Sequence, residues 1–203
     1  LPMLAGSLLQ QCYNIADTLI VGQCIGANAL AAVGSAYTLM VFLISILLGL
    51  SMGSGTVFSL QYGAGDLSAL RRSIYVSLLL IGTVTILLNV AVFLWLDPIL
   101  RWLQVPYDIY SLMRNYLWII FWGIVFTFLY NFYAALLRAV GDSVTPLWFL
   151  AVSVVLNIGL DLFLILVLDQ GIEGAAVATV IAQGTAASGI LLYTYKTRPE
   201  LRL

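Results

Sequence analysis

Charged residues are scarce in this sequence. Only 8% of its 203 residues are Asp, Glu, Lys or Arg, whereas soluble domains contain about 25%. So few charges cannot cover a surface that faces water, and 63% of the residues are hydrophobic, so the chain must be solvated by lipid. The net charge of −1 leaves no basic surface, which argues against a nucleic-acid partner.

Histidine is absent, which removes the usual metal ligand and the usual proton relay and leaves carboxylates for proton chemistry. Cys12 and Cys24 would lie about 18 Å apart along a helix, whereas a disulfide needs Cα atoms within about 7 Å. Phosphate loops, nucleophile elbows and metal-binding motifs are missing too, so the sequence predicts no enzyme and no cofactor.

One short motif points toward an enzyme. The segment "YGAGD" contains the Gly-x-Gly-Asp pattern that intramembrane aspartyl proteases also carry. Such an enzyme needs two carboxyl groups about 3 Å apart, and no second Asp pairs convincingly with Asp66. We therefore interpret the motif as the end of a helix.

Long apolar runs predict an all-α membrane protein with six spanning helices, because each span needs about 20 mostly apolar residues. The six cover residues 2–25, 32–62, 74–96, 111–137, 146–168 and 174–195. The second is longer than a bilayer requires and contains "GLSMGSG" at 49–55. We expect tilt, a kink or an end outside the membrane there.

Basic residues indicate how the spans are oriented. Arg101 and Arg114 follow an odd-numbered span, whereas the other Lys and Arg residues follow even-numbered spans: Arg71, Arg72, Arg138, Lys196, Arg198 and Arg202. Because Lys and Arg favour cytoplasmic loops, the ends of the even-numbered spans and the N-terminus are predicted to be cytoplasmic.

Two spans carry polar stripes on otherwise apolar helices. In the first, Gln10, Tyr13, Asn14 and Asp17 follow the spacing i, i+3, i+4 and i+7, which is one helical face. An ionised Asp near the bilayer centre costs about 2.5–3.5 kcal/mol on insertion scales, so it should face the protein interior or a cavity.

The second stripe, in the fifth span, contains Ser153, Asn157 and Asp161 at i, i+4 and i+8. Both carboxylates fall about 4–6 Å beyond the middle of spans that run in the same direction, so Asp17 and Asp161 are predicted at similar depth. Such a pair could share a proton or hold Na⁺, with Asn157 beside it. The alternative is that each Asp only makes hydrogen bonds between helices or ends a helix.

Further polar residues are weaker candidates for a cavity wall. Thr179 and Gln183 share a face of the sixth span. Thr127, Tyr130 and Asn131 share a face of the fourth. Each could line a cavity or make a hydrogen bond between helices, which is worth about 0.6 kcal/mol on average.

These segments together resemble the N-terminal half of a multidrug and toxic compound extrusion (MATE) transporter. The resemblance covers the whole chain and rests on "LPMLAGSLLQQCYNIADTLIVGQCIGANALAAVG", "GLSMGSGTVFSLQYGAGD", "LLRAVGDSVTP", "LNIGLDLFLI" and "GIEGAAVATVIAQ". It implies that residues 1–203 form one six-helix lobe of a transporter with two such lobes. The partner that completes the substrate cleft would then be the C-terminal lobe, which this fragment lacks.

The resemblance also implies roles for single residues. Asp17 matches the acidic residue that the family uses for cation coupling, and Asn157 and Asp161 match its Asn-x-x-x-Asp in the fifth span. Thr179 falls where the family places a polar residue near the same pocket. The expected function is export of small organic, cationic compounds across the plasma membrane in exchange for H⁺ or Na⁺.

Three other functions stay open at this point. A lipid-linked oligosaccharide flippase of the same superfamily would be expected to line its cavity with Arg, yet no Arg falls inside a predicted span apart from Arg114 near the start of the fourth. An intramembrane enzyme would need a matched catalytic pair. A helical assembly or anchor module would leave the matching depth of the two carboxylates unexplained.

Overall fold

The computed structural model describes residues 2–202, with the side chains of residues 2–5 and 7 left aside, and this part of the chain is helical without a strand. Its helices are α1 (Pro2–Cys24), α2 (Ala27–Gly63), α3 (Leu67–Trp102), α4 (Tyr107–Trp122), α5 (Ile124–Ala139), α6 (Val144–Leu162) and α7 (Gly171–Thr197). A π-helical turn (Phe163–Val167) continues α6, and a 3₁₀ turn (Pro199–Leu201) follows α7.

The six predicted spans are confirmed as helical segments, with one correction. The predicted span at 111–137 is two helices, α4 and α5, which meet at an angle of 45°. By length and hydropathy, α2, α3, α6 with its π-helical turn, and α7 can each cross a membrane, and the bent pair α4–α5 adds a fifth. Helix α1 falls outside this group, since Gln10, Asn14 and Asp17 lower its hydropathy.

The second span also differs from expectation at 49–55. Helix α2 runs without a break from Ala27 to Gly63, so the glycines of this segment do not interrupt it. The irregular backbone lies instead in α3, where Trp95 leaves the helical region three residues before Pro98. A proline ring displaces the carbonyl of the preceding turn, which explains a kink at this place.

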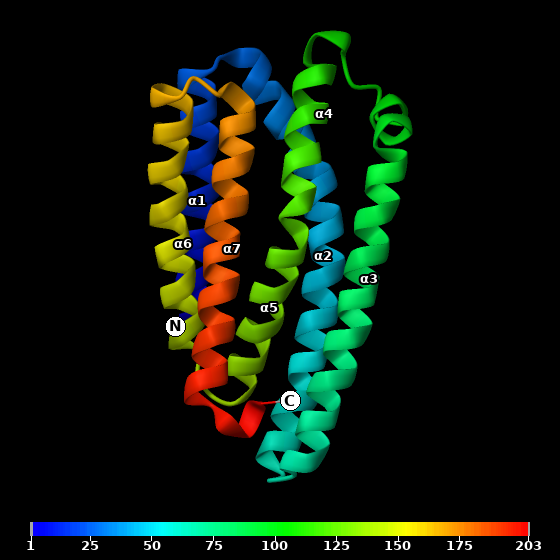
Figure 1. The fold of residues 1–203 in the computed structure, drawn as a ribbon, viewed down its shortest axis with the longest axis vertical. Coiled ribbons are helices and arrows are strands. Elements are labelled where there is room, and N and C mark those ends of the chain that lie inside the picture. Colours follow the sequence, from blue (N-terminus) through cyan, green and yellow to red (C-terminus); the bar gives the residue numbers. More distant parts are fainter. Residues whose placement is uncertain (1, 203) are drawn as a thin grey trace.

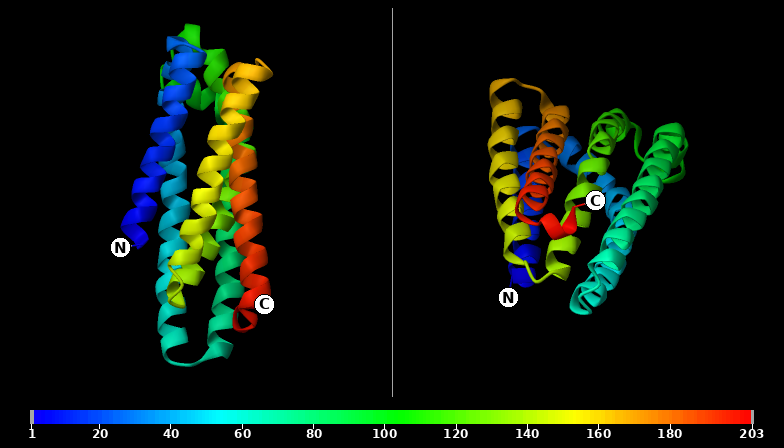
Figure 2. Two further views of the ribbon diagram at one scale, coloured as in Figure 1. Left: turned by 90° about the vertical axis from the view of Figure 1, so that its left-hand side faces the viewer. Right: turned by 60° about the horizontal axis from the view of Figure 1, so that its bottom comes forward.

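The helices form two groups with the bent pair between them (Figure 1). Helices α1, α6 and α7 pack together on one side, and α2 packs with α3 on the other. Helices α4 and α5 each contact both α2 and α7, so this bent pair joins the two groups. The right-hand view of Figure 2 shows the same division of the bundle.

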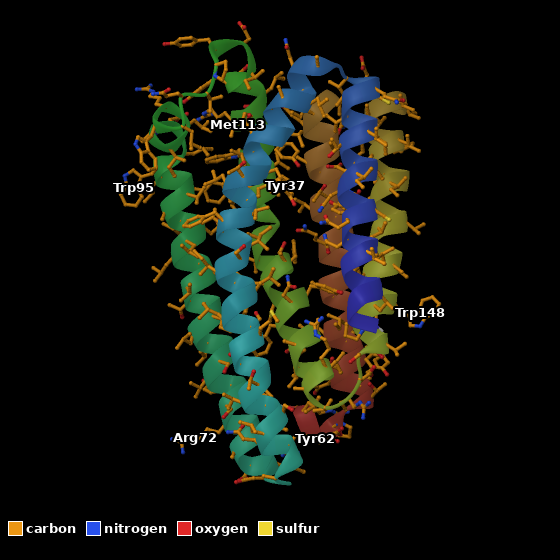
Figure 3. The ribbon with its side chains drawn as sticks, turned by 180° about the vertical axis from the view of Figure 1, so that it is seen from behind. Tyr37, Tyr62, Arg72, Trp95, Met113 and Trp148 are labelled. Atoms are coloured by element: carbon orange, nitrogen blue, oxygen red, sulfur yellow. The ribbon has the colours of Figure 1, made fainter. Side chains whose placement is uncertain are left out.

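The apolar surface of the bundle is what a lipid environment requires. Leu87 and Leu94 on α3 are 63% and 68% exposed, and Trp148 projects outward from α6 (Figure 3). Aromatic residues gather near the α3–α4 connection, where Trp102 and Tyr107 are 84% and 97% exposed. Side chains of this kind are favoured at the membrane–water boundary.

The connections at the opposite end carry the expected helix-stop chemistry. Gly141 has φ +90° and follows α5, and the N–H of Asp142 donates to the Leu137 carbonyl at 2.9 Å, which is the Schellman arrangement. Asp66 begins α3 by accepting from the N–H of Ala69 at 2.9 Å. The interpretation of "YGAGD" as a helix end is confirmed, and Gly141 caps α5.

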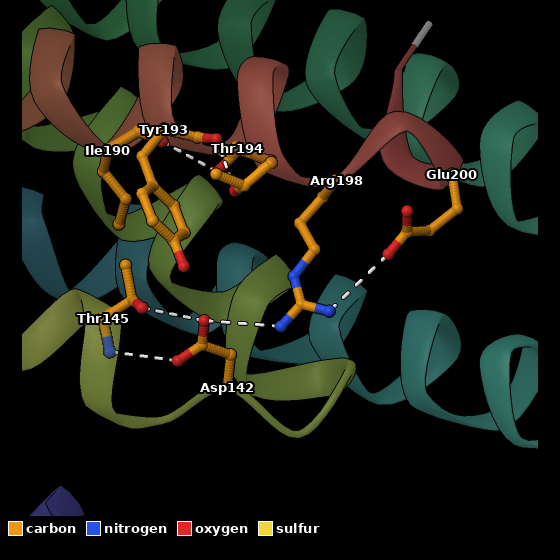
Figure 4. Close-up of polar contacts among 8 residues, drawn as sticks. Asp142, Thr145, Ile190, Tyr193, Thr194, Arg198 and Glu200 are labelled. Atoms are coloured by element: carbon orange, nitrogen blue, oxygen red, sulfur yellow. Dashed lines mark hydrogen bonds and ion pairs between the residues drawn. The ribbon is translucent and has the colours of Figure 1, made fainter.

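A polar cluster fastens the chain after α7 at this same end (Figure 4). Arg198 lies 3.6 Å from Asp142 in the α5–α6 connection and 3.7 Å from Glu200. Arg71 of α3 donates to the backbone carbonyl of Glu200 at 3.1 Å. The 3₁₀ turn therefore ties the end of α7 to both α3 and the α5–α6 connection.

Candidate functional site

A cavity of about 780 Å³ lies between the two helix groups. Helices α1 and α2 supply most of its wall, and α4, α5, α6 and α7 supply the rest. All seven residues predicted as cavity-lining from the sequence lie on this wall: Gln10, Tyr13, Asn14, Tyr130, Asn131, Thr179 and Gln183. The same surface includes Asp17.

Asp17 and Asp161 come together across the α1–α6 contact. Helices α1 and α6 pack side by side, and the two carboxyl groups lie within hydrogen-bonding reach of each other. Asp17 is 8% exposed and Asp161 is fully buried. Among the described residues, one oxygen of each, Oδ1, is buried without a hydrogen-bond partner. A buried, unpartnered carboxylate oxygen is costly, so this pair is suited to holding a proton or a cation.

Asn157 connects Asp161 to α7. With its amide oxygen facing Thr179, the Asn157 nitrogen donates to Asp161 Oδ2 at 2.9 Å. Its oxygen then accepts from the hydroxyl and the backbone N–H of Thr179, at 3.3 and 3.2 Å. Asn157 is fully buried, so it lies behind the cavity wall rather than on it.

Tyr13 extends this set of hydrogen bonds to the cavity surface. Its hydroxyl lies 3.2 Å from Thr179 Oγ1 and, in the same orientation of Asn157, donates to it. The resulting series runs from Tyr13 through Thr179 and Asn157 to Asp161. A change at the carboxylates can therefore reach the cavity wall through three hydrogen bonds, one within α6, one from α7 to α6 and one from α1 to α7.

The cavity wall also contains a second polar group. The Thr127 hydroxyl donates to Gln183 Oε1 at 2.7 Å, and Asn131 Nδ2 donates to the Thr127 carbonyl at 2.8 Å. Tyr130 donates to the Pro146 carbonyl at 2.9 Å. These residues both line the cavity and hydrogen-bond between or within helices, so the two readings of them are compatible.

Two tyrosines on the cavity wall were missed in the sequence. Tyr116 of α4 is buried, and Tyr37 of α2 is 48% exposed on the α2 side of the cavity (Figure 3). Tyr37 has no polar neighbour at helical spacing that would mark its face as special. Tyr116 lies eleven residues before Thr127, which is about three helical turns, so the two share a face and this spacing could have identified Tyr116.

Comparison with known proteins decides the family. The sequence profile of the MatE family matches residues 2–163 of this chain. The chain belongs to the MatE family.

Relatives of this MatE chain are named as multidrug resistance or multidrug export proteins. It is 37% identical over 196 residues to the probable multidrug resistance protein YpnP of Bacillus subtilis, and 32% identical over 204 residues to the multidrug export protein MepA of Staphylococcus aureus. Each alignment covers 97% of this chain but 44% of the relative. The MatE chain thus spans less than half the length of these curated relatives.

Solved structures agree with this assignment. The fold matches the outward-facing conformation of a multidrug resistance MATE family transporter of the MOP superfamily with a TM-score of 0.90 and 25% identity. The match covers 97% of the MatE chain and 44% of that transporter, as expected for one lobe. The predicted fold class, an all-α membrane bundle that forms one lobe of a larger transporter, is confirmed.

Proposed function

We propose that residues 1–203 form the N-terminal lobe of a secondary active antiporter that exports organic cations in exchange for H⁺ or Na⁺. The observation that carries the proposal is the buried pair Asp17 and Asp161 at the edge of a large cavity. Each has one oxygen without a hydrogen-bond partner in the described part of the chain, and Asp161 is joined through Asn157 to the cavity wall. Export names among the relatives support the same direction of transport.

The coupling step is neutralisation of the carboxylate pair. A proton, or Na⁺ held by Asp17, Asp161 and the amide of Asn157, removes the penalty of two buried charges and favours closer packing of α1 on α6. An ion shifts a conformational equilibrium only by its different affinity for the two states. Because Asp17 also faces the cavity, this repacking changes the surface offered to a substrate.

The cavity has the size and chemistry for an organic cation. Its volume of about 780 Å³ lies within the usual range of about 300–1,000 Å³ for small-molecule sites. Aromatic faces attract cations, and four tyrosines lie on the wall: Tyr13, Tyr37, Tyr116 and Tyr130. Arg and Lys do not occur among the described lining residues, so the flippase alternative is not favoured.

The proposed setting is the plasma membrane, with both described chain ends toward the cytoplasm. Both ends lie toward the end of the bundle that holds the α2–α3 and α5–α6 connections (Figure 1). Basic residues concentrate there, which supports this orientation. In the full-length protein, a single cysteine at Gln170 should react with an impermeant reagent from outside and one at Ser143 from inside. The reverse pattern would overturn the orientation.

The whole function is tested with the full-length protein in lipid vesicles. An imposed H⁺ or Na⁺ gradient should drive transport of ethidium, a planar organic cation, and the ion that drives it identifies the coupling. Residues 1–203 purified alone should not transport, because alternating access needs two lobes around a shared site. Ethidium movement that ignores both gradients would reject the antiporter.

A further inference from the structure

The break between α4 and α5 is built around Gly123. Its N–H donates to the Ile120 carbonyl at 2.8 Å, a tight turn in place of a regular helical bond. A Cβ at position 123 would lie 2.9 Å from Val180 Cγ2 and 3.1 Å from the Ile120 carbonyl oxygen. Close packing against α7 therefore requires glycine at the break.

The carbonyl of Phe121, just before the break, is bound by a side chain from another helix. Asn89 of α3 donates from Nδ2 to this oxygen at 2.6 Å. An unbroken α-helix would place the N–H of Val125 on the same oxygen. Since water is missing from the bilayer core, a carbonyl that loses its helical donor needs another partner. Asn89 provides that donor and thereby stabilises the bent form of the span.

Both halves of the bent span contribute to the cavity. Tyr116 lies on α4, whereas Thr127, Tyr130 and Asn131 lie on α5. The angle at the break consequently sets how far Tyr116 stands from these three. Asn89 itself lies outside the set of cavity-lining residues, so its effect on the cavity must pass through the Phe121 carbonyl.

A ligand in the cavity has a direct route to the break. The Thr127 hydroxyl has one proton and two acceptors within reach, Gln183 Oε1 at 2.7 Å and the Gly123 carbonyl at 3.3 Å. A ligand that hydrogen-bonds to Gln183 Oε1 in place of Thr127 frees the Thr127 hydroxyl to donate to the carbonyl of Gly123, the residue at the break. A void of about 10 Å³ beside Ile120, Phe121 and Ile124 gives the break room to adjust.

We propose that Asn89 is a positioning residue for substrate binding: by holding the Phe121 carbonyl it fixes the α4–α5 angle and so the spacing of the cavity tyrosines. The proposal rests on the proposed function for its ligand and on the structure for its geometry. It assigns a part in shaping the cavity to α3, which lies on the side of the bundle opposite α1 and α6 (Figure 1).

Replacing Asn89 by Leu tests the angle. Without the amide, the Phe121 carbonyl needs the N–H of Val125, which straightens the span. Arms of about 18 Å (residues 111–122) and 24 Å (residues 124–139) end about 39 Å apart when bent by 45° and about 42 Å apart when straight. Spin labels at Ser111 and Ala139 of the full-length protein, with Cys12 and Cys24 replaced by Ala, should therefore move apart by about 3 Å.

The same variant tests the ligand. Ethidium affinity of Asn89→Leu should fall about tenfold, whereas Thr85→Val should change neither the distance nor the affinity. Thr85 is a matched control because it is buried on the same helix and its hydroxyl donates to the Ile81 carbonyl of that helix. If the leucine variant does not fold, Asn89→Ser replaces it, since serine is too short to reach Phe121.

Each result decides the proposal. An unchanged label distance overturns the role of Asn89 at the break, and a changed distance with unchanged ethidium affinity overturns its link to the cavity. If the unsubstituted protein binds no ethidium, the proposed function fails, while the distance measurement still decides whether Asn89 sets the angle.

Discussion

Replacing Asp17 by Asn removes one charge from the carboxylate pair with almost no change in shape. Asp17 is 8% exposed, and its Oδ1 atom has no partner among the described residues. An ionised Asp costs about 2.5–3.5 kcal/mol at the centre of a membrane helix. We therefore expect Asp17→Asn to be at least as stable as the natural protein when thermal unfolding is measured in detergent.

The loss of cation binding should be large. A monovalent cation about 3 Å from a carboxylate interacts with it by about 5.5 kcal/mol at an effective dielectric constant of about 20. Even when half of this is offset by removing water from the ion, about 2.7 kcal/mol remains, which is about a hundredfold in affinity. Export of ethidium driven by the ion gradient should fall by at least this factor.

The assay uses full-length protein in vesicles with an imposed H⁺ or Na⁺ gradient. Asp17→Asn should still bind ethidium, more weakly, because the tyrosines of the cavity remain. Asp169→Asn is the matched control: this Asp is exposed after the π-helical turn, and its φ of +51° is one that Asn tolerates. Normal gradient-driven export by Asp17→Asn would refute the role of the carboxylate pair.

Three further predictions concern stability and are read from unfolding in detergent. Gly123→Ala should cost about 1–3 kcal/mol by overpacking, whereas Gly34→Ala, whose Cβ would meet nothing within 4 Å, should be neutral or stabilising. Gly141→Val should cost about 1–3 kcal/mol because φ is +90°, and unchanged stability would remove the cap argument. Burial alone would raise the pKa of Asp142, but hydrogen bonds within its turn and the charge of Arg198 outweigh it and hold that pKa below its usual range. A lowered folded-state pKa adds stability that is complete above about pH 4 and disappears as the pH falls further, so Asp142→Asn should abolish this acid-dependent loss.

The spans and the polar stripes were predictable because they are properties of one helix at a time. Apolar runs and the spacing of Asp17, Asn157 and Asp161 can be counted along the sequence. The break at Gly123 was not predictable in this way, because it depends on close packing of Gly123 against Val180 of α7. Tyr116 carried a usable signal, because it lies eleven residues before Thr127, about three helical turns, and therefore shares its face.

The hydrogen bonds between helices could not be predicted from the sequence either. Thr179 and Asn157 were each predicted as polar positions, but their pairing depends on how α6 and α7 are rotated against each other. The roles of these residues, and of the carboxylate pair, remain predictions that the transport experiments decide.

The fastening of the 3₁₀ turn has a mechanical consequence. Arg71 and Arg198 tether residues 199–200, so a pull on the chain beyond residue 202 acts sideways on α3 and the α5–α6 connection before it acts along α7. In a transporter whose second lobe follows this one, movement of the second lobe would then exert a sideways force on α3 and the α5–α6 connection of the first lobe. Arg71→Ala should shift the load to α7, and single-molecule pulling from the C-terminal side would record it as earlier unfolding of that helix.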